Sequence, residues 1–152
     1  MALSGKVVGE VEIQAPAAKF YNFYKKQLEH LPNISTHIHG ARVHEGDWET
    51  VGSVKQWEYT IDGKKISDTV KIVSIDDDNM AITYVFDREV SEDYKSFKAT
   101  IQAIDKEHGG GIVKWTFEYE KLKEHIKGVS HDSYLDVGIK VAKEIDAHLV
   151  KE

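Results

Sequence analysis

The middle of the chain, residues 37–120, consists of short runs in which polar and apolar residues alternate, separated by turn signals. In residues 97–103 and 113–119, every odd-numbered position is apolar or aromatic and every even-numbered position is polar. Alternation with a period of two predicts strands that have one dry face and one wet face. Because strands that follow one another through tight turns pair antiparallel, this section predicts an antiparallel sheet rather than a parallel one.

Turn residues divide this section into six strands. Asp62-Gly63 is a strong signal for a two-residue hairpin, and the segments 76–79 and 108–111 predict further turns because they are rich in Asp, Asn and Gly. Residues 46–52 are interpreted as a longer loop. Together with the run 7–13 near the start of the chain, seven strands are predicted.

Two of these strands show their faces less clearly. Between residues 54 and 59, Trp57 and Tyr59 are taken as the inward pair, although Lys55 shares their parity. In residues 64–75 the parity is ambiguous and stays open. The pattern therefore shows the inner face of the sheet clearly for two strands, the runs 97–103 and 113–119.

Two segments outside the sheet predict helices. Pro16 suits the first turn of a short helix, where its missing N–H costs nothing, and a second short helix or broken extension over residues 25–31 is expected to end at Pro32. Residues 131–151 predict an amphipathic helix about 30 Å long, with Ser130 as its N-cap. Its apolar face contains Leu135, Gly138, Ala142, Ile145 and Leu149, with Tyr134 and Val141 beside it.

Composition limits the classes of function. A formal charge of −6, with acids and bases interleaved, argues against a nucleic-acid partner, which needs clustered Lys and Arg. The chain has no cysteine, which excludes disulfides, thiolate zinc sites and thiol nucleophiles. The first residues lack the apolar core of a secretory signal, and no apolar run approaches the ~20 residues of a membrane span. We expect a cytoplasmic monomer without stable membrane insertion.

Four local sequences appear in a characteristic order: Pro16–Tyr21 (PAAKFY), Glu45–Trp48 (EGDW), Gly52–Trp57 (GSVKQW) and Asp77–Met80 (DDNM). In these motifs and in its order of elements, the chain resembles the plant major latex protein-like members of the Bet v I (pathogenesis-related class ten) superfamily. The resemblance implies an α+β helix-grip, START-like fold in one ligand-binding domain, residues 1–152. In it, a curved antiparallel sheet of seven strands surrounds the long C-terminal helix, in the order β-α-α-β-β-β-β-β-β-α.

The resemblance also implies a function. Similar proteins bind steroids, fatty acids, phytohormones or other apolar metabolites in a cavity between sheet and helix, in defence, stress or hormone response. A filled core would show the same inward stripe of aromatic residues, and it is the resemblance that favours a cavity. The predicted ligand-binding residues are Tyr24, Ile38, Trp57, Tyr59, Tyr84, Phe97, Ile101, Trp115, Phe117, Tyr119, Tyr134, Gly138, Val141 and Ile145.

Gly138 admits two interpretations. A glycine inside a helix costs about 1 kcal/mol relative to alanine, so a reason for it is expected. It either leaves room for a ligand beneath the helix or allows the helix to approach the sheet closely. The two interpretations are equally compatible with the sequence.

Other chemistry has weaker support. His37 and His39 share a strand face and could chelate a metal, but no carboxylate or cysteine stands at a recognisable spacing, so no metal site is predicted. The glycines 109–111 join two strands rather than opening a helix, so no dinucleotide cofactor is predicted. In the resembled family, the loop at 46–52 is glycine-rich, whereas here it keeps two glycines, which weakens a nuclease role.

An enzyme of secondary metabolism, acting by cyclisation, condensation or isomerisation in the same cavity, is the main alternative. Such reactions need a general acid and base inside the cavity. On the strands 97–103 and 113–119, every inward position is apolar or aromatic, while Lys98, Lys114 and Glu118 point outward. The sequence therefore favours binding without a catalytic residue.

Overall fold

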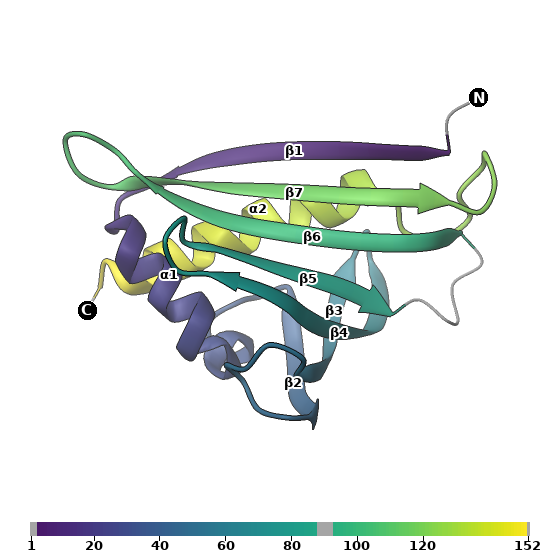
Figure 1. The fold of residues 1–152 in the computed structure, drawn as a ribbon, viewed down its shortest axis with the longest axis horizontal. Helices are drawn as coiled ribbons and strands as arrows, with labels where there is room; N and C mark the ends of the chain where they lie inside the picture. Colours follow the sequence, from purple (N-terminus) through teal and green to yellow (C-terminus); the bar gives the residue numbers. More distant parts are fainter. Residues whose placement is uncertain (1–2, 88–92, 152) are drawn as a thin grey trace.

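The computed structural model describes residues 3–87 and 93–151, and in them a seven-stranded antiparallel sheet holds a long helix (Figure 1). The strands pair in the spatial order β1-β7-β6-β5-β4-β3-β2. Every pairing is antiparallel, as the alternating runs predicted. The elements in chain order are β1 (Ser4–Ile13), α1 (Ala17–Lys26), the 3-10 helix η1 (Leu28–Asn33), β2 (Ile38–Glu45), β3 (Val54–Ile61), β4 (Lys64–Asp76), β5 (Ala81–Asp87), β6 (Tyr94–Asp105), β7 (Gly111–Lys121) and α2 (His131–Leu149).

The long helix α2 lies along the sheet, and α1 lies beside its carboxyl-terminal end (Figure 1). The first turn of α2 is capped as predicted, because the Ser130 side chain accepts a hydrogen bond from the backbone N–H of Ser133. Near its other end, the Asp146 carboxylate accepts hydrogen bonds from the backbone N–H groups of Gln14 and Ala15 at 2.9–3.1 Å. These contacts tie α2 to the corner between β1 and α1.

The short helices differ slightly from the prediction. Pro16 is the N-cap of α1 rather than a first-turn residue, with an extended ψ of 142°. The prediction that Pro32 ends the second helix was wrong, because Pro32 lies inside η1. The backbone N–H groups of Ile34 and Ser35 both donate to the carbonyl of Leu31. These hydrogen bonds do not need the backbone N–H that Pro32 lacks.

The faces of the sheet follow the predicted parity along the middle of β6 and most of β7, where the odd-numbered residues between Phe97 and Ala103 and between Gly111 and Phe117 are buried. The structure also settles β4, where Asp68, Val70 and Ile72 are buried on the inner face. A shift in the β4–β5 register follows between Ile72 and Ser74. This irregularity changes the parity within the run 64–75, which is why the alternation there was ambiguous.

Candidate ligand-binding cavity

A cavity of about 110 Å³ lies between the inner face of the sheet and α2. Its lining comes from helices α1, η1 and α2 and from strands β2, β3, β4, β5 and β7. The lining residues are Tyr24, Leu28, Leu31, Ile38, Trp57, Tyr59, Ile61, Val70, Tyr84, Phe86, Trp115, Phe117, Tyr134, Val137, Gly138 and Val141. Apart from the glycine, every one of them is aliphatic or aromatic.

The size of the cavity sets a limit on what fits without movement. Sites for drug-sized ligands measure roughly 300–1,000 Å³, whereas an engineered apolar cavity of about 150 Å³ stays dry and binds benzene. At about 110 Å³ the present cavity belongs to the second class. A larger guest requires lining side chains to change rotamer.

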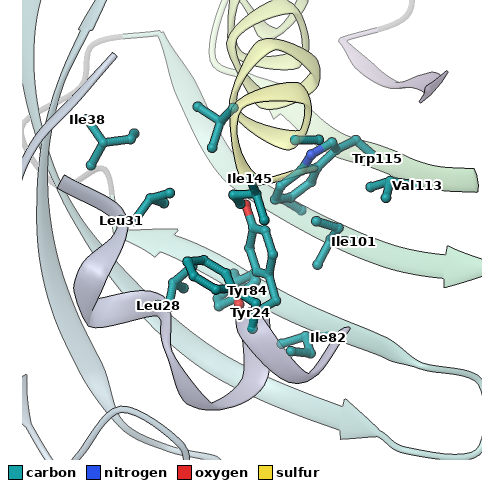
Figure 2. Packing of buried hydrophobic residues seen from close by; sticks show 14 of the residues in the cluster. Tyr24, Leu28, Leu31, Ile38, Ile82, Tyr84, Ile101, Val113, Trp115 and Ile145 are labelled. Carbon is teal, nitrogen blue, oxygen red and sulfur yellow. The ribbon is translucent and has the colours of Figure 1, made fainter. Parts of the chain in front are cut away.

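Ten of the fourteen predicted residues line this cavity: Tyr24, Ile38, Trp57, Tyr59, Tyr84, Trp115, Phe117, Tyr134, Gly138 and Val141. They come from six elements that are far apart in sequence. Figure 2 shows part of this group, with Tyr24 and Tyr84 below the end of α2, Trp115 beside it and Ile38 on the other side. The fold therefore brings together most of the predicted set.

The other four predicted residues, Phe97, Ile101, Tyr119 and Ile145, are outside the cavity lining among the described residues. Phe97, Ile101 and Ile145 are no more than 2 % exposed and belong to filled core. Tyr119 has the predicted parity but lies near the end of β7, where its ring stacks on His131 at 3.9 Å between centroids. Period two identifies the inner face but does not distinguish its packed parts from its hollow part.

Six lining residues were missed: Leu28, Leu31, Ile61, Val70, Phe86 and Val137. Two of them carried a usable signal, because Ile61 continues the parity of Tyr59 on β3 and Phe86 continues that of Tyr84 on β5. Val70 lies on β4, whose parity was open. Leu28 and Leu31 belong to the short helix η1, whose packing against β2 and α1 no local pattern indicates.

Gly138 lies directly against Trp115. The indole Nε1 of Trp115 donates a hydrogen bond to the Gly138 carbonyl at 3.0 Å. A Cβ atom on Gly138 would be 3.2 Å from the same nitrogen, which is tight for a van der Waals contact. Of the two interpretations, close approach of helix and sheet describes this contact, although the residue also borders the cavity.

One pair of cavity tyrosines has its hydroxyls engaged. Tyr59 and Tyr134 both donate to Oδ2 of Asp68, the second at 2.6 Å. Asp68 is buried on the inner face of β4. Burial raises the pKa of the Tyr59 hydroxyl well above its usual range, and the Asp68 carboxylate adds to the effect, so Tyr59 stays a neutral donor. We refer to Tyr59 and Tyr134 as the Asp68-bound pair.

A second pair of cavity tyrosines has no such partner. Tyr24 on α1 and Tyr84 on β5 are each 6 % exposed, and their hydroxyls make no hydrogen bond with any residue that the structure describes. Burial raises the pKa of both hydroxyls, so both are neutral at physiological pH. Figure 2 shows the two rings close to each other between α1 and the sheet. We refer to Tyr24 and Tyr84 as the open pair.

The structure also contains a buried lysine that the sequence did not single out. Lys55 is 2 % exposed on the inner side of β3, where its Nζ donates to the carbonyl of Trp48 at 2.7 Å and lies 5.1 Å from that indole ring centre. Burial lowers the pKa of its amine to about 8. Lys55 therefore holds the loop 46–52 and is outside the cavity lining among the described residues.

The two histidines considered as metal ligands are engaged separately. His37 Nδ1 lies 3.2 Å from Oε1 of Glu144 on α2, and His39 Nε2 lies 2.6 Å from the Thr60 hydroxyl. Glu144 also accepts hydrogen bonds from Ser35 and Thr36.

Among residues 3–87 and 93–151, no helix has the length and apolar character needed to cross a membrane.

The chain is similar to plant proteins. The model of the pathogenesis-related protein Bet v 1 family matches residues 2–152. MLP-like protein 43 of Arabidopsis thaliana is 38 % identical over 155 residues, which cover 99 % of this chain and 96 % of that protein. Ginseng major latex-like protein 151 from Panax ginseng superposes with a TM-score of 0.88 at 32 % identity, over 97 % of this chain and 98 % of that one.

A more distant structure shares the fold alone. It is a Thalictrum norcoclaurine synthase point mutant in complex with a transition state analogue, with a TM-score of 0.77 at 13 % identity. The match covers 97 % of both chains.

Proposed function

Because the chain belongs to the pathogenesis-related protein Bet v 1 family, whose members bind hydrophobic ligands, we propose that it binds an apolar small molecule in the cavity beneath α2 and carries or stores it. The observation that carries the proposal is the lining, which contains aliphatic and aromatic side chains and one glycine. Burial of apolar ligand surface contributes about 25 cal/mol per Å², from which the cost of association is subtracted. No charged anchor is needed for such binding.

The ligand classes proposed are steroids, fatty acids, phytohormones and similar plant metabolites. The proposed role of the protein is in defence, stress or hormone response, as a cytoplasmic monomer. A cavity of about 110 Å³ holds none of the larger ones without rearrangement. Uptake of a steroid therefore requires lining side chains to move.

Catalysis in the same cavity, the alternative function, has less support. The lining contains no Lys, Asp, Glu or His among the described residues, and tyrosine is its only ionisable side chain. The hydroxyl protons of the Asp68-bound pair are engaged with a carboxylate, and the Lys55 amine is engaged with a loop carbonyl. A general acid–base pair facing a substrate is therefore not formed by these groups.

Identification of a co-purifying ligand tests the proposal most directly. We expect native mass spectrometry of the protein from its own tissue to detect an added mass, and extraction into organic solvent to yield an apolar compound. A displacement assay with an apolar fluorophore measures the affinity of that compound. No bound compound and no fluorophore uptake would contradict the proposal.

The Gly138→Leu variant locates the binding. A leucine at this position meets Trp115 and extends into the cavity, so we expect fluorophore uptake to weaken at least tenfold and stability to fall by about 1–3 kcal/mol. Lys143→Leu places the same side chain on the exposed face of α2 and serves as the control. Equal uptake by both variants would place the ligand elsewhere.

A further inference from the structure

The four tyrosines that line the cavity differ in whether their hydroxyls have a hydrogen-bond partner in the protein. The hydroxyl protons of Tyr59 and Tyr134 are used internally, because both point to Oδ2 of Asp68. The residues Tyr24 and Tyr84 are equally enclosed, at 6 % exposure each, but their hydroxyls have no hydrogen-bond partner among the described residues. Buried hydroxyls normally have a partner, so this pair requires an explanation.

A ligand supplies the explanation. The open pair lies on the cavity wall and belongs to two different elements, α1 and β5. Each neutral hydroxyl can donate one hydrogen bond and accept another. A guest with one hydroxyl or carbonyl group therefore finds its partner on this wall, while the Asp68-bound pair has no proton left to offer.

The shape of the rest of the cavity defines the body of the guest. Eight of the sixteen lining residues are aromatic, and the ring of Tyr24 meets Trp115 edge to face with centroids 5.9 Å apart. Trp115 in turn stacks on Phe117 at 5.5 Å. Aromatic rings favour such edge and offset contacts with one another, and the volume of about 110 Å³ is of the order that benzene occupies in an apolar cavity.

We propose that the preferred ligand is a single-ring aromatic compound that carries one hydroxyl or carbonyl group, with the ring among Trp115 and Phe117 and the oxygen at the hydroxyl of Tyr24 or of Tyr84. This inference rests on the proposed function and names its ligand class. It differs from a steroid or fatty-acid ligand in size, and from a hydrocarbon in its oxygen.

Phenol and benzene form a matched pair of probes, because they differ by one oxygen. In an apolar cavity without a free partner, the buried hydroxyl makes phenol bind much more weakly than benzene. We expect the wild-type protein to bind phenol within about threefold of benzene or more tightly, as measured by calorimetry and by chemical-shift changes of the cavity residues. Phenol binding more than tenfold weaker than benzene would overturn the inference.

The double variant Tyr24→Phe/Tyr84→Phe removes both hydroxyls and keeps both rings. Phenol affinity is expected to fall roughly tenfold, the effect of one or two lost hydrogen bonds, while benzene affinity changes by less than threefold. Tyr21→Phe is the control, because Tyr21 lies on the same helix but donates to Asp77 outside the cavity lining. Unchanged phenol affinity in the double variant would refute the assignment to this pair.

The two levels of the proposal fail differently. Fluorophore uptake without phenol binding would overturn the ligand class and leave apolar ligand binding in place. Absence of both would overturn the proposed function together with this inference.

Discussion

The cavity has two pairs of tyrosines that are buried to nearly the same extent and differ in what their hydroxyls contact. Tyr59 and Tyr134 surround the carboxylate of Asp68, and their rings meet edge to face at 6.1 Å between centroids. Tyr24 and Tyr84 are as deeply buried but lie among apolar side chains. The difference teaches that burial alone does not define the role of a polar group: the first pair stabilises the wall, and the second is available to a guest.

Replacement of Asp68 should have the largest effect on this arrangement. Asp68→Ala leaves two buried hydroxyls without their acceptor, and we expect a loss of about 3 kcal/mol in the free energy of unfolding. Urea denaturation measures it. Glu58→Ala, which removes an exposed carboxylate from the neighbouring strand, should change stability by less than about 0.5 kcal/mol. Similar losses in both variants would contradict a structural role for Asp68.

Loss of one donor should have a smaller effect than loss of the acceptor. Tyr134→Phe keeps the ring and removes one hydrogen bond to a charged group, so we expect destabilisation of about 2 kcal/mol with an unchanged denaturant slope. A loss below about 0.5 kcal/mol in the free energy of unfolding would mean that the hydrogen bond from the Tyr134 hydroxyl to Asp68 stabilises the fold no more than a hydrogen bond to water would.

At alkaline pH, Tyr59 should behave like Tyr24 and Tyr84, although its hydroxyl is hydrogen-bonded and theirs are not. Burial raises the pKa of the Tyr24, Tyr59 and Tyr84 hydroxyls in the folded state, whereas in the unfolded chain they titrate near the ordinary value of about 10. Above pH 10 the unfolded chain releases these protons and the folded protein keeps them. Stability is therefore fully present below pH 10 and falls as the pH rises, by about 1.4 kcal/mol per pH unit for each group.

This alkaline effect separates burial from hydrogen bonding. Tyr59→Phe and Tyr84→Phe should each reduce the slope of stability against pH between 10 and 11 by the same amount, although they differ at neutral pH. Denaturant titrations at a series of pH values measure the slope. Unequal reductions would mean that one of the two hydroxyls reaches solvent.

Sequence patterns predicted the frame of the cavity better than its polar interior. The alternation on β6 and β7 identified Trp115 and Phe117 as inward residues, because period two follows directly from strand geometry. Asp68 was not predicted, since β4 changes register near Ile72 and a carboxylate on an apolar face contradicts the binary pattern. Its partner Tyr134 comes from α2, 66 residues away, and no local pattern relates the two.

The hollow itself also depends on tertiary packing. Ile101 and Trp115 are directly paired on neighbouring strands with the same inward parity, yet only Trp115 borders the cavity in the described structure. Which inward side chains touch α2 is decided by how the sheet curves and how far the helix lies from it. The resemblance to a family, rather than any periodicity, was what predicted open volume.

Removal of a hydroxyl from the open pair should have the smallest effect on stability and is the sharpest test of the comparison. In the empty protein, Tyr84→Phe deletes a buried hydroxyl that has no partner among the described residues, so we expect unfolding free energy to stay the same or rise by up to about 1 kcal/mol. The same change at Tyr59 should cost about 2 kcal/mol, because it removes a hydrogen bond to a carboxylate. Destabilisation of Tyr84→Phe by as much as Tyr59→Phe would show that its hydroxyl is already satisfied, and a hydroxyl satisfied within the protein has no reason to select an oxygen-bearing guest.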